Sequence, residues 1–159
     1  MSKKHHWLSL FVLIAATFGA SAFGVLATTS SLATWYPSLA KPSWNPPNEV
    51  FGPVWTALYL IMAIAAWLVW RRGSEAEVVP AMTAYFGQLV LNVLWSLIFF
   101  GLRAPGWAVL DIVILWVAIV MAIAQFGKVS RAAAWLLVPY PAWVTFASVL
   151  NITIWRINS

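Results

Sequence analysis

Long runs without charge are the feature of this chain that most constrains its fold. Such runs extend over residues 5–40, 50–70, 78–102, 112–127 and 132–155. Charged residues make up 8% of the 159-residue chain, whereas a soluble domain averages roughly 25%. An apolar run of about 20 residues is long enough to cross a bilayer as a helix. The sequence therefore predicts an all-α integral membrane protein.

Five apolar segments of this length divide the chain. They span residues 7–28, 50–70, 79–100, 106–126 and 132–155. Every connector except the first is short, so sequential helices are expected to be antiparallel neighbours. We predict one domain over residues 1–159, a bundle of five transmembrane helices with a long Trp/Pro-rich loop between the first and second helices. Pro139 and Pro141 should kink the fifth helix, because proline interrupts the backbone hydrogen bonds.

The first segment carries two further patterns. Ala20-Ser21-Ala22 resembles a signal-peptide cleavage site, but the apolar run continues beyond it, so we expect a retained helix. Ala16, Ala20 and Gly24 recur every four residues, a spacing that permits close helix–helix approach. We expect this stripe to pack within the molecule, with a dimer interface as the alternative.

The basic residues predict an orientation. Lys3, Lys4, Arg71, Arg72, Lys128 and Arg131 lie on the side of the N-terminus, and Lys41, Arg103 and Arg156 lie on the other side. The more basic side of a membrane protein faces the cytoplasm. We therefore expect a cytoplasmic N-terminus in a bacterial inner membrane; a bacterial or mitochondrial outer membrane is the alternative.

The loop before the second helix is rigid and aromatic. Pro37, Pro42, Pro46 and Pro47 limit it to few conformations, because proline fixes φ and restricts the residue before it. Trp35, Tyr36 and Trp44 add flat apolar faces that each carry one polar atom. Such a loop is suited to covering something flat and apolar.

Polar groups inside the helices fall on three aromatic stripes. One holds Gln88, Asn92, Trp95 and Phe99, another Trp107 and Asp111, and the third Trp143, Ala147 and Asn151. Residues three or four apart share one face of a helix. If the stripes converge, they form an apolar pocket with a few polar contacts, which is the usual form of a small-molecule site.

A structural interpretation competes with this one. Asn and Gln in membrane helices often only join neighbouring helices. Asp111 is expected near the interface, paired with Arg103, and Trp107 also fits the interfacial aromatic belt. Trp55 and Trp143 lie deeper in their segments and fit the belt less well.

Several kinds of chemistry are not indicated. The chain has no cysteine, and its two histidines, His5 and His6, are adjacent near the N-terminus. The sequence shows no metal-ligand cluster and no hydrolase triad, so no metal or bound cofactor is expected. A nucleic-acid partner is also not expected, because no basic patch on a soluble domain is available.

Several motifs together carry a family resemblance. They are Trp35-Tyr36-x-x-Leu39-x-Lys41-Pro42-x-Trp44-x-Pro46-Pro47, Phe51-x-Pro53-x-Trp55-x-x-Leu58-Tyr59, Gln88-Leu89-x-Leu91-Asn92-x-x-Trp95, Phe99-Phe100-Gly101, and Pro139-Tyr140-x-x-Trp143 followed by Leu150-Asn151. This pattern resembles the TspO/MBR family, the tryptophan-rich sensory proteins and mitochondrial translocator proteins. The resemblance extends over essentially the whole chain.

The resemblance implies a dimeric five-helix bundle with a cavity beneath the first loop. The ligand-binding residues that we predict from the stripes and the family together are Tyr36, Trp44, Trp55, Asn92, Trp95, Phe99, Trp107, Trp143, Ala147, Leu150 and Asn151. Family members bind porphyrins such as protoporphyrin IX, and some bind cholesterol or isoquinoline carboxamides. The family's sterol motif has a tyrosine where this chain has Ile152, so we do not expect strong sterol binding through it.

Three functions follow as hypotheses. The first is a membrane sensor or receptor for tetrapyrroles, whose carboxylates would reach Lys41 or backbone N–H groups at proline-broken helix ends. The second is an enzyme that degrades protoporphyrin IX in light and oxygen, with Trp55 and Trp143 as the residues that the resemblance assigns to the reaction. The third is a porphyrin or sterol transporter, for which the sequence offers no energy-coupling motif.

Overall fold

The computed structural model describes residues 3–159, without the side chains of residues 3–6 and 27. The elements are α1 (Lys3–Ala33), the 3-10 turn η1 (Tyr36–Ser38), α2 (Asn48–Trp70), α3 (Glu75–Ser96), the π-helical turn η2 (Leu97–Gly101), α4 (Pro105–Val129), α5 (Arg131–Leu137) and α6 (Pro139–Ile157). The side chains of the basic leader and of both histidines lie outside this description.

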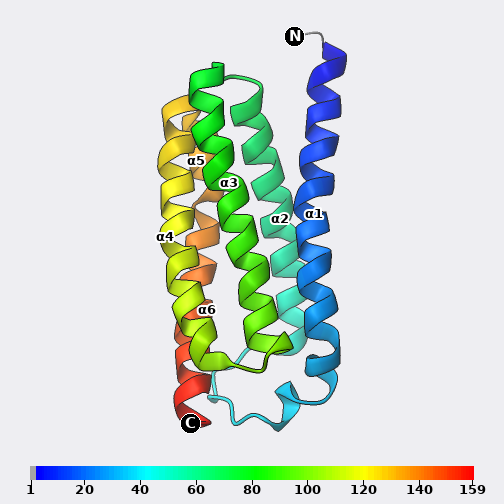
Figure 1. Ribbon diagram of the computed structural model, residues 1–159, viewed down its shortest axis with the longest axis vertical. Coiled ribbons are helices and arrows are strands. Elements are labelled where there is room, and N and C mark those ends of the chain that lie inside the picture. The colour runs from blue at the N-terminus through cyan, green and yellow to red at the C-terminus, as the bar shows by residue number, and fades with distance from the viewer. Residues whose placement is uncertain (1–2) are drawn as a thin grey trace.

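The helices form an upright bundle with the two termini at opposite ends (Figure 1). α1 stands at one edge of the bundle, beside α2 and α3, while α4 packs against α3 and α6. The loop between α1 and α2 lies at the end that holds the C-terminus. This arrangement confirms the predicted five-helix bundle, with α5 and α6 together forming the fifth span.

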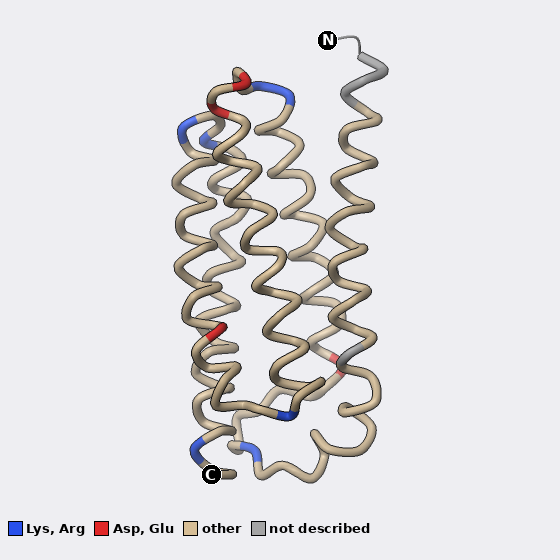
Figure 2. The backbone as a smooth tube through the Cα atoms, viewed as in Figure 1, with Lys and Arg blue, Asp and Glu red and all other residues tan. Residues whose placement is uncertain are grey.

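Hydropathy and charge both fit a bundle that crosses a membrane. Among the described residues, five spans are long and apolar enough to do so: Trp7–Leu26, Asn48–Trp70, Glu75–Gly101, Pro105–Val129 and Arg131–Ile157. Most of the Lys, Arg, Asp and Glu residues gather at the two ends of the bundle, as Figure 2 shows. The long middle of the bundle therefore presents an almost uncharged surface to its surroundings.

Local sequence explains where several helices begin and bend. Ser74 and Glu77 form a capping box that satisfies backbone N–H groups at the start of α3. The Ser130 side chain accepts a hydrogen bond from the backbone N–H of Ala133 at the start of α5. The predicted interruption of the fifth span is confirmed, because the helix breaks at Val138, directly before Pro139.

The buried face of α1 differs from the predicted one. Of the expected stripe, Gly24 is buried, but Ala16 is exposed and Ala20 is only partly buried. Hydrogen bonds set the rotation of this helix instead: Thr17 bonds to the Tyr85 hydroxyl, and the Ser31 hydroxyl donates to the backbone carbonyl of η2. Small size permits close packing, whereas these polar pairs select which face turns inward.

Candidate functional site

A cavity of about 410 Å³ lies between α1, α2, the end of α3 with η2, and α6. Its size falls within the range of roughly 300–1,000 Å³ that is usual for small-molecule pockets. The cavity sits beneath the start of the α1–α2 loop, since Tyr36 of η1 contributes to its wall. Sequence segments far apart in the chain therefore meet at one site.

Nine of the eleven predicted ligand-binding residues line this cavity. They are Tyr36, Trp55, Asn92, Trp95, Phe99, Trp143, Ala147, Leu150 and Asn151. The first and third polar stripes thus converge, while the second stripe, on α4, contributes none of the lining residues.

Aromatic rings from α2 and α6 line the cavity. On α2, the ring of Trp55 stacks on Tyr59 with the centroids 5.6 Å apart and an interplanar angle of 30°. On α6, the ring of Trp143 meets the edge of Phe51 at 5.9 Å and 68°. Such packing fixes the orientation of each indole, so the cavity offers preformed flat surfaces to a ligand.

A buried chain of hydrogen bonds forms the polar part of the floor. The Tyr59 hydroxyl donates to Asn92 Oδ1 at 2.6 Å, and Asn92 Nδ2 donates to the Tyr140 hydroxyl at 3.0 Å. Tyr140 in turn donates to Gln88 Oε1 at 2.8 Å. Asn92 and Gln88 therefore join α2, α3 and α6, as the structural interpretation expects, although Asn92 also lines the cavity.

A second polar link lies beside the cavity. Trp95 Nε1 donates to Asn151 Oδ1 at 3.0 Å, and Asn151 Nδ2 donates to the backbone carbonyl of Pro105 at 2.9 Å. This link joins the third span, the fifth span and the start of α4. The Trp95 indole N–H and the Asn151 amide therefore both have hydrogen-bond partners within the protein. These bonds hold the indole of Trp95 in place beside the cavity.

Trp143 differs from Trp95 in the hydrogen bonding of its indole nitrogen. Its Nε1 is buried and has no hydrogen-bond partner within the described part of the chain. A buried donor without a partner costs free energy. Because this atom is enclosed by the protein, a ligand in the cavity accepts a hydrogen bond from it only when the indole ring turns towards the cavity.

Hydrogen bonds hold the α1–α2 loop in place at the end of the bundle. The buried hydroxyl of Tyr36 donates to Asn45 Oδ1 at 3.2 Å, and burial raises the pKa of this phenol despite that bond, so the hydroxyl keeps its proton. Asn158, next to the C-terminus, exchanges two 2.9 Å hydrogen bonds with the backbone of Ala40. These bonds hold the loop over the end of the bundle.

Lys41 is already engaged within this loop. Its ammonium donates to the carbonyls of Tyr36 and Leu39, both at 2.8 Å, and lies 4.8 Å from the centre of the Tyr36 ring. It is not among the residues that line the cavity. The expected contact between Lys41 and ligand carboxylates therefore has no support in this geometry.

Two predicted site residues lie elsewhere. Trp44 is 46% exposed and packs its ring on the edge of Phe146 rather than on the cavity. Trp107 is 71% exposed on the outer face of α4. The spacing of Trp107 and Asp111 correctly places them on neighbouring turns, but α4 lies on the other side of α3 and α6 from the cavity.

The expected pairing of Asp111 with Arg103 is wrong. Asp111 is only 7% exposed, and its Oδ2 has no hydrogen-bond partner among the described residues. Arg103 is exposed in the turn before α4, where its backbone takes a left-handed conformation with φ of 53°. A membrane carboxyl group is thus left buried without a partner.

Sequence reasoning missed the lining residues of α1, and also lining residues of α2 and of the end of the third span, such as Tyr59 and Phe100. Ser21, Gly24 and Thr28 line the cavity. A Cβ atom added at Gly24 would approach Ser96 Oγ to 3.3 Å, so glycine keeps α1 close to α3 here. Ser21 and Thr28 follow the inward rotation of α1, which the small-residue stripe alone predicts incorrectly.

Comparison with known proteins accounts for this architecture. The model of the TspO/MBR family matches residues 11–156, almost the whole chain. The chain belongs to the TspO/MBR family. With five apolar spans and this family membership, it is an integral, multi-pass membrane protein.

Relatives from distant organisms share the family pattern. The tryptophan-rich protein TspO of Chlorobaculum tepidum is 42% identical over 153 residues, covering 95% of this chain and 94% of the relative. The human translocator protein is 44% identical over 126 residues, covering 78% and 75%. The tryptophan-rich sensory protein of Cereibacter sphaeroides is 36% identical over 141 residues, covering 87% of each.

Proposed function

We propose that this TspO/MBR protein is a membrane sensor or receptor whose cavity binds a tetrapyrrole such as protoporphyrin IX. The observation that carries the proposal is the cavity itself: the indoles of Trp55 and Trp143 line an apolar space of the size usual for small-molecule sites. A porphyrin is flat and apolar and carries ring nitrogens and carboxylates as acceptors. The names of the relatives, a sensory protein and a translocator protein, support the sensor reading.

The rim of the cavity supports entry from the bilayer. Val25 of α1 is 54% exposed although it lines the cavity, and Gly52 and Thr56 of α2 are exposed as well. An apolar ligand dissolved in the membrane can therefore reach the aromatic side chains of the cavity by passing between α1 and α2. Isoquinoline carboxamides are also apolar and could enter by the same route.

A porphyrin titration tests this proposal. Purified protein in detergent is titrated with protoporphyrin IX, and the shift of the Soret band and the quenching of tryptophan fluorescence are followed. We expect saturable binding by the wild type. The matched variant Trp107→Phe, changed outside the cavity, should bind equally well, whereas Ala147→Phe, which fills the cavity, should bind at least tenfold more weakly, about 1.4 kcal/mol. Equal binding by all three proteins would place the ligand elsewhere.

A second candidate function is light- and oxygen-dependent degradation of the bound porphyrin. The observation that favours it is that Trp55 of α2 and Trp143 of α6 line the same cavity. In this reaction, dioxygen is the oxidant, the excited macrocycle is oxidised, and the indoles can relay an electron. Illumination of the complex in air should bleach the Soret band faster than it bleaches free porphyrin in the same detergent, and Trp55→Phe should slow the loss. Equal rates with and without protein would exclude catalysis.

We also propose that the N-terminus lies in the cytoplasm of a bacterial inner membrane. The distribution of basic residues supports this orientation. Because the chain has no cysteine, single-cysteine variants report topology directly. Ser38→Cys in the loop should react with a membrane-impermeant thiol reagent on intact spheroplasts, whereas Glu75→Cys at the other end should react only after lysis. The reverse pattern would invert the topology.

A further inference from the structure

A second concave site lies on the outside of the bundle, away from the cavity. It is a groove of about 430 Å³ between the end of the third span and α4, which we call the α3/α4 groove. Its lining is Ile98, Leu102, Trp107, Leu110, Asp111 and Ile114. Leu102, Trp107 and Leu110 are more than half exposed, so the groove opens to the surroundings of the bundle.

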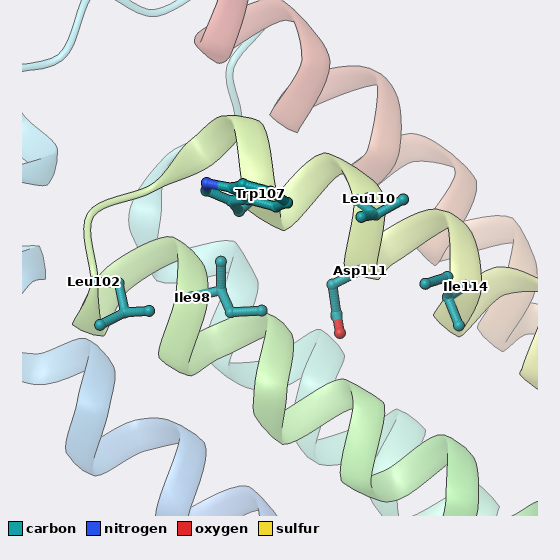
Figure 3. A pocket seen from close by; sticks show the side chains of 6 residues that line it. All are labelled: Ile98, Leu102, Trp107, Leu110, Asp111 and Ile114. Atoms are coloured by element: carbon teal, nitrogen blue, oxygen red, sulfur yellow. The ribbon is translucent and has the colours of Figure 1, made fainter.

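The floor of the groove holds one polar group. Figure 3 shows the carboxyl of Asp111 pointing from α4 towards α3, with Ile98 on one side and Ile114 on the other. Asp111 is six residues after Pro105, which begins α4, so it lies about 9 Å along the helix axis, within the span. Its Oδ2 is buried and has no partner in the described part of the chain.

An unpaired acidic group at this depth requires an explanation. Ionisable residues within membrane spans are costly and normally pair with other groups or serve a function. The network that satisfies Asn92 and Asn151 leaves Asp111 out, and the exposed Arg103 does not pair with it. The Oδ2 atom of Asp111 therefore has no hydrogen-bond partner among the described residues.

We propose that the α3/α4 groove binds a single-chain apolar amine from the bilayer, with its nitrogen at Asp111. The walls are aliphatic and suit an alkyl chain, whereas the only acidic group suits a cation. Trp107 borders the groove with its indole, and a cation near such a ring gains further attraction. This site is separate from the cavity and does not depend on the function proposed for it.

Charge balance favours an amine over a ligand of fixed charge. A neutral amine can enter from the bilayer and accept the proton of the Asp111 carboxyl on its nitrogen. The products are an ammonium and a carboxylate in contact, so no net charge is carried into the membrane. The N–H of the ammonium then donates to the Asp111 carboxylate where it faces the groove, and hydrogen bonds between charged groups are the stronger kind.

Binding of dodecylamine tests the proposal directly. The full-length protein is placed in phosphatidylcholine nanodiscs, and equilibrium binding of tritiated dodecylamine is measured against empty nanodiscs. We expect one saturable site per chain. Dodecanol, which has the same chain but forms no cation, should bind about tenfold more weakly, as expected for loss of a hydrogen bond between charged groups.

Two variants keep the result interpretable. Asp111→Asn removes the charge with little change in volume and should weaken amine binding about tenfold, to the level of the alcohol. Ile114→Trp keeps the carboxyl and fills the groove, so it should abolish binding of both probes. Elution volume and thermal midpoint are measured for each variant to show that the fold is retained.

Several outcomes would overturn the proposal. Equal affinities for amine and alcohol would show that charge pairing is not the basis of recognition. Displacement of the amine by saturating protoporphyrin IX would assign it to the cavity. Absence of amine binding, together with a change of oligomeric state in Asp111→Asn, would show that a second copy of the chain covers the groove.

Discussion

Replacement of Trp143 by phenylalanine separates ligand binding from stability. The substitution keeps an aromatic ring against Phe51 and Phe146 but removes the indole Nε1, which is buried without a partner. A neutral hydrogen bond contributes about 0.5–1.5 kcal/mol, so a porphyrin that accepts one from Trp143 should bind roughly 2- to 12-fold more weakly to the variant. The protein itself loses no hydrogen bond.

Stability should therefore respond differently from affinity. A buried donor without a partner costs about 1–3 kcal/mol, so its removal offsets the packing that the smaller ring gives up. We expect the free energy of unfolding of Trp143→Phe to be unchanged or higher.

Trp95→Phe is the matched control for this prediction. Trp95 also lines the cavity, but its Nε1 already donates to Asn151 Oδ1 at 3.0 Å. Its removal leaves that buried oxygen unsatisfied, which should lower the free energy of unfolding by about 1–3 kcal/mol. The two substitutions are chemically identical, so the contrast isolates the role of the hydrogen-bond partner.

The assay combines two measurements on the same samples. Soret titration with protoporphyrin IX gives the affinity, and thermal or denaturant unfolding in detergent gives the stability. The reasoning is refuted if Trp143→Phe binds porphyrin like the wild type, or if it is destabilised as strongly as Trp95→Phe.

Two further predictions concern the polar floor and the loop. Asn92→Leu should destabilise the fold by about 1–3 kcal/mol, because it leaves Tyr59 and Tyr140 without a shared partner, and unchanged unfolding would contradict this. Asn158→Ala removes both bonds to Ala40, so limited proteolysis should cut the loop about fivefold faster. Bound ligand should slow that cleavage, and equal rates with and without ligand would argue against a cover.

Much of the site could be predicted because helical spacing determines which residues share a face. The stripes that contain Asn92 and Trp143 point into one cavity, as their spacing indicates. The stripe of Trp107 and Asp111 has the same spacing but lies on a helix that packs elsewhere. Spacing gives the face of a helix, and it does not give the neighbour that this face meets.

The missed residues of α1 have the same cause. A small-residue stripe predicts close approach, yet Ala16 faces outward. The rotation of α1 follows from the pairing of Thr17 with Tyr85, which lie 68 positions apart along the chain. Local sequence spacing does not predict a contact between residues so far apart in the chain.

The sequence by itself determined the membrane class, the five spans, the break before Pro139 and the aromatic character of the loop. Each depends on a local property: charge-free length, the missing N–H of proline, or the identity of a side chain. Only the tertiary structure determined which polar groups remain without partners. Trp143 and Asp111 are distinguished from Trp95 and Asn92 by contacts between distant helices. Those contacts leave the indole N–H of Trp143 and the Oδ2 atom of Asp111 without partners among the described residues.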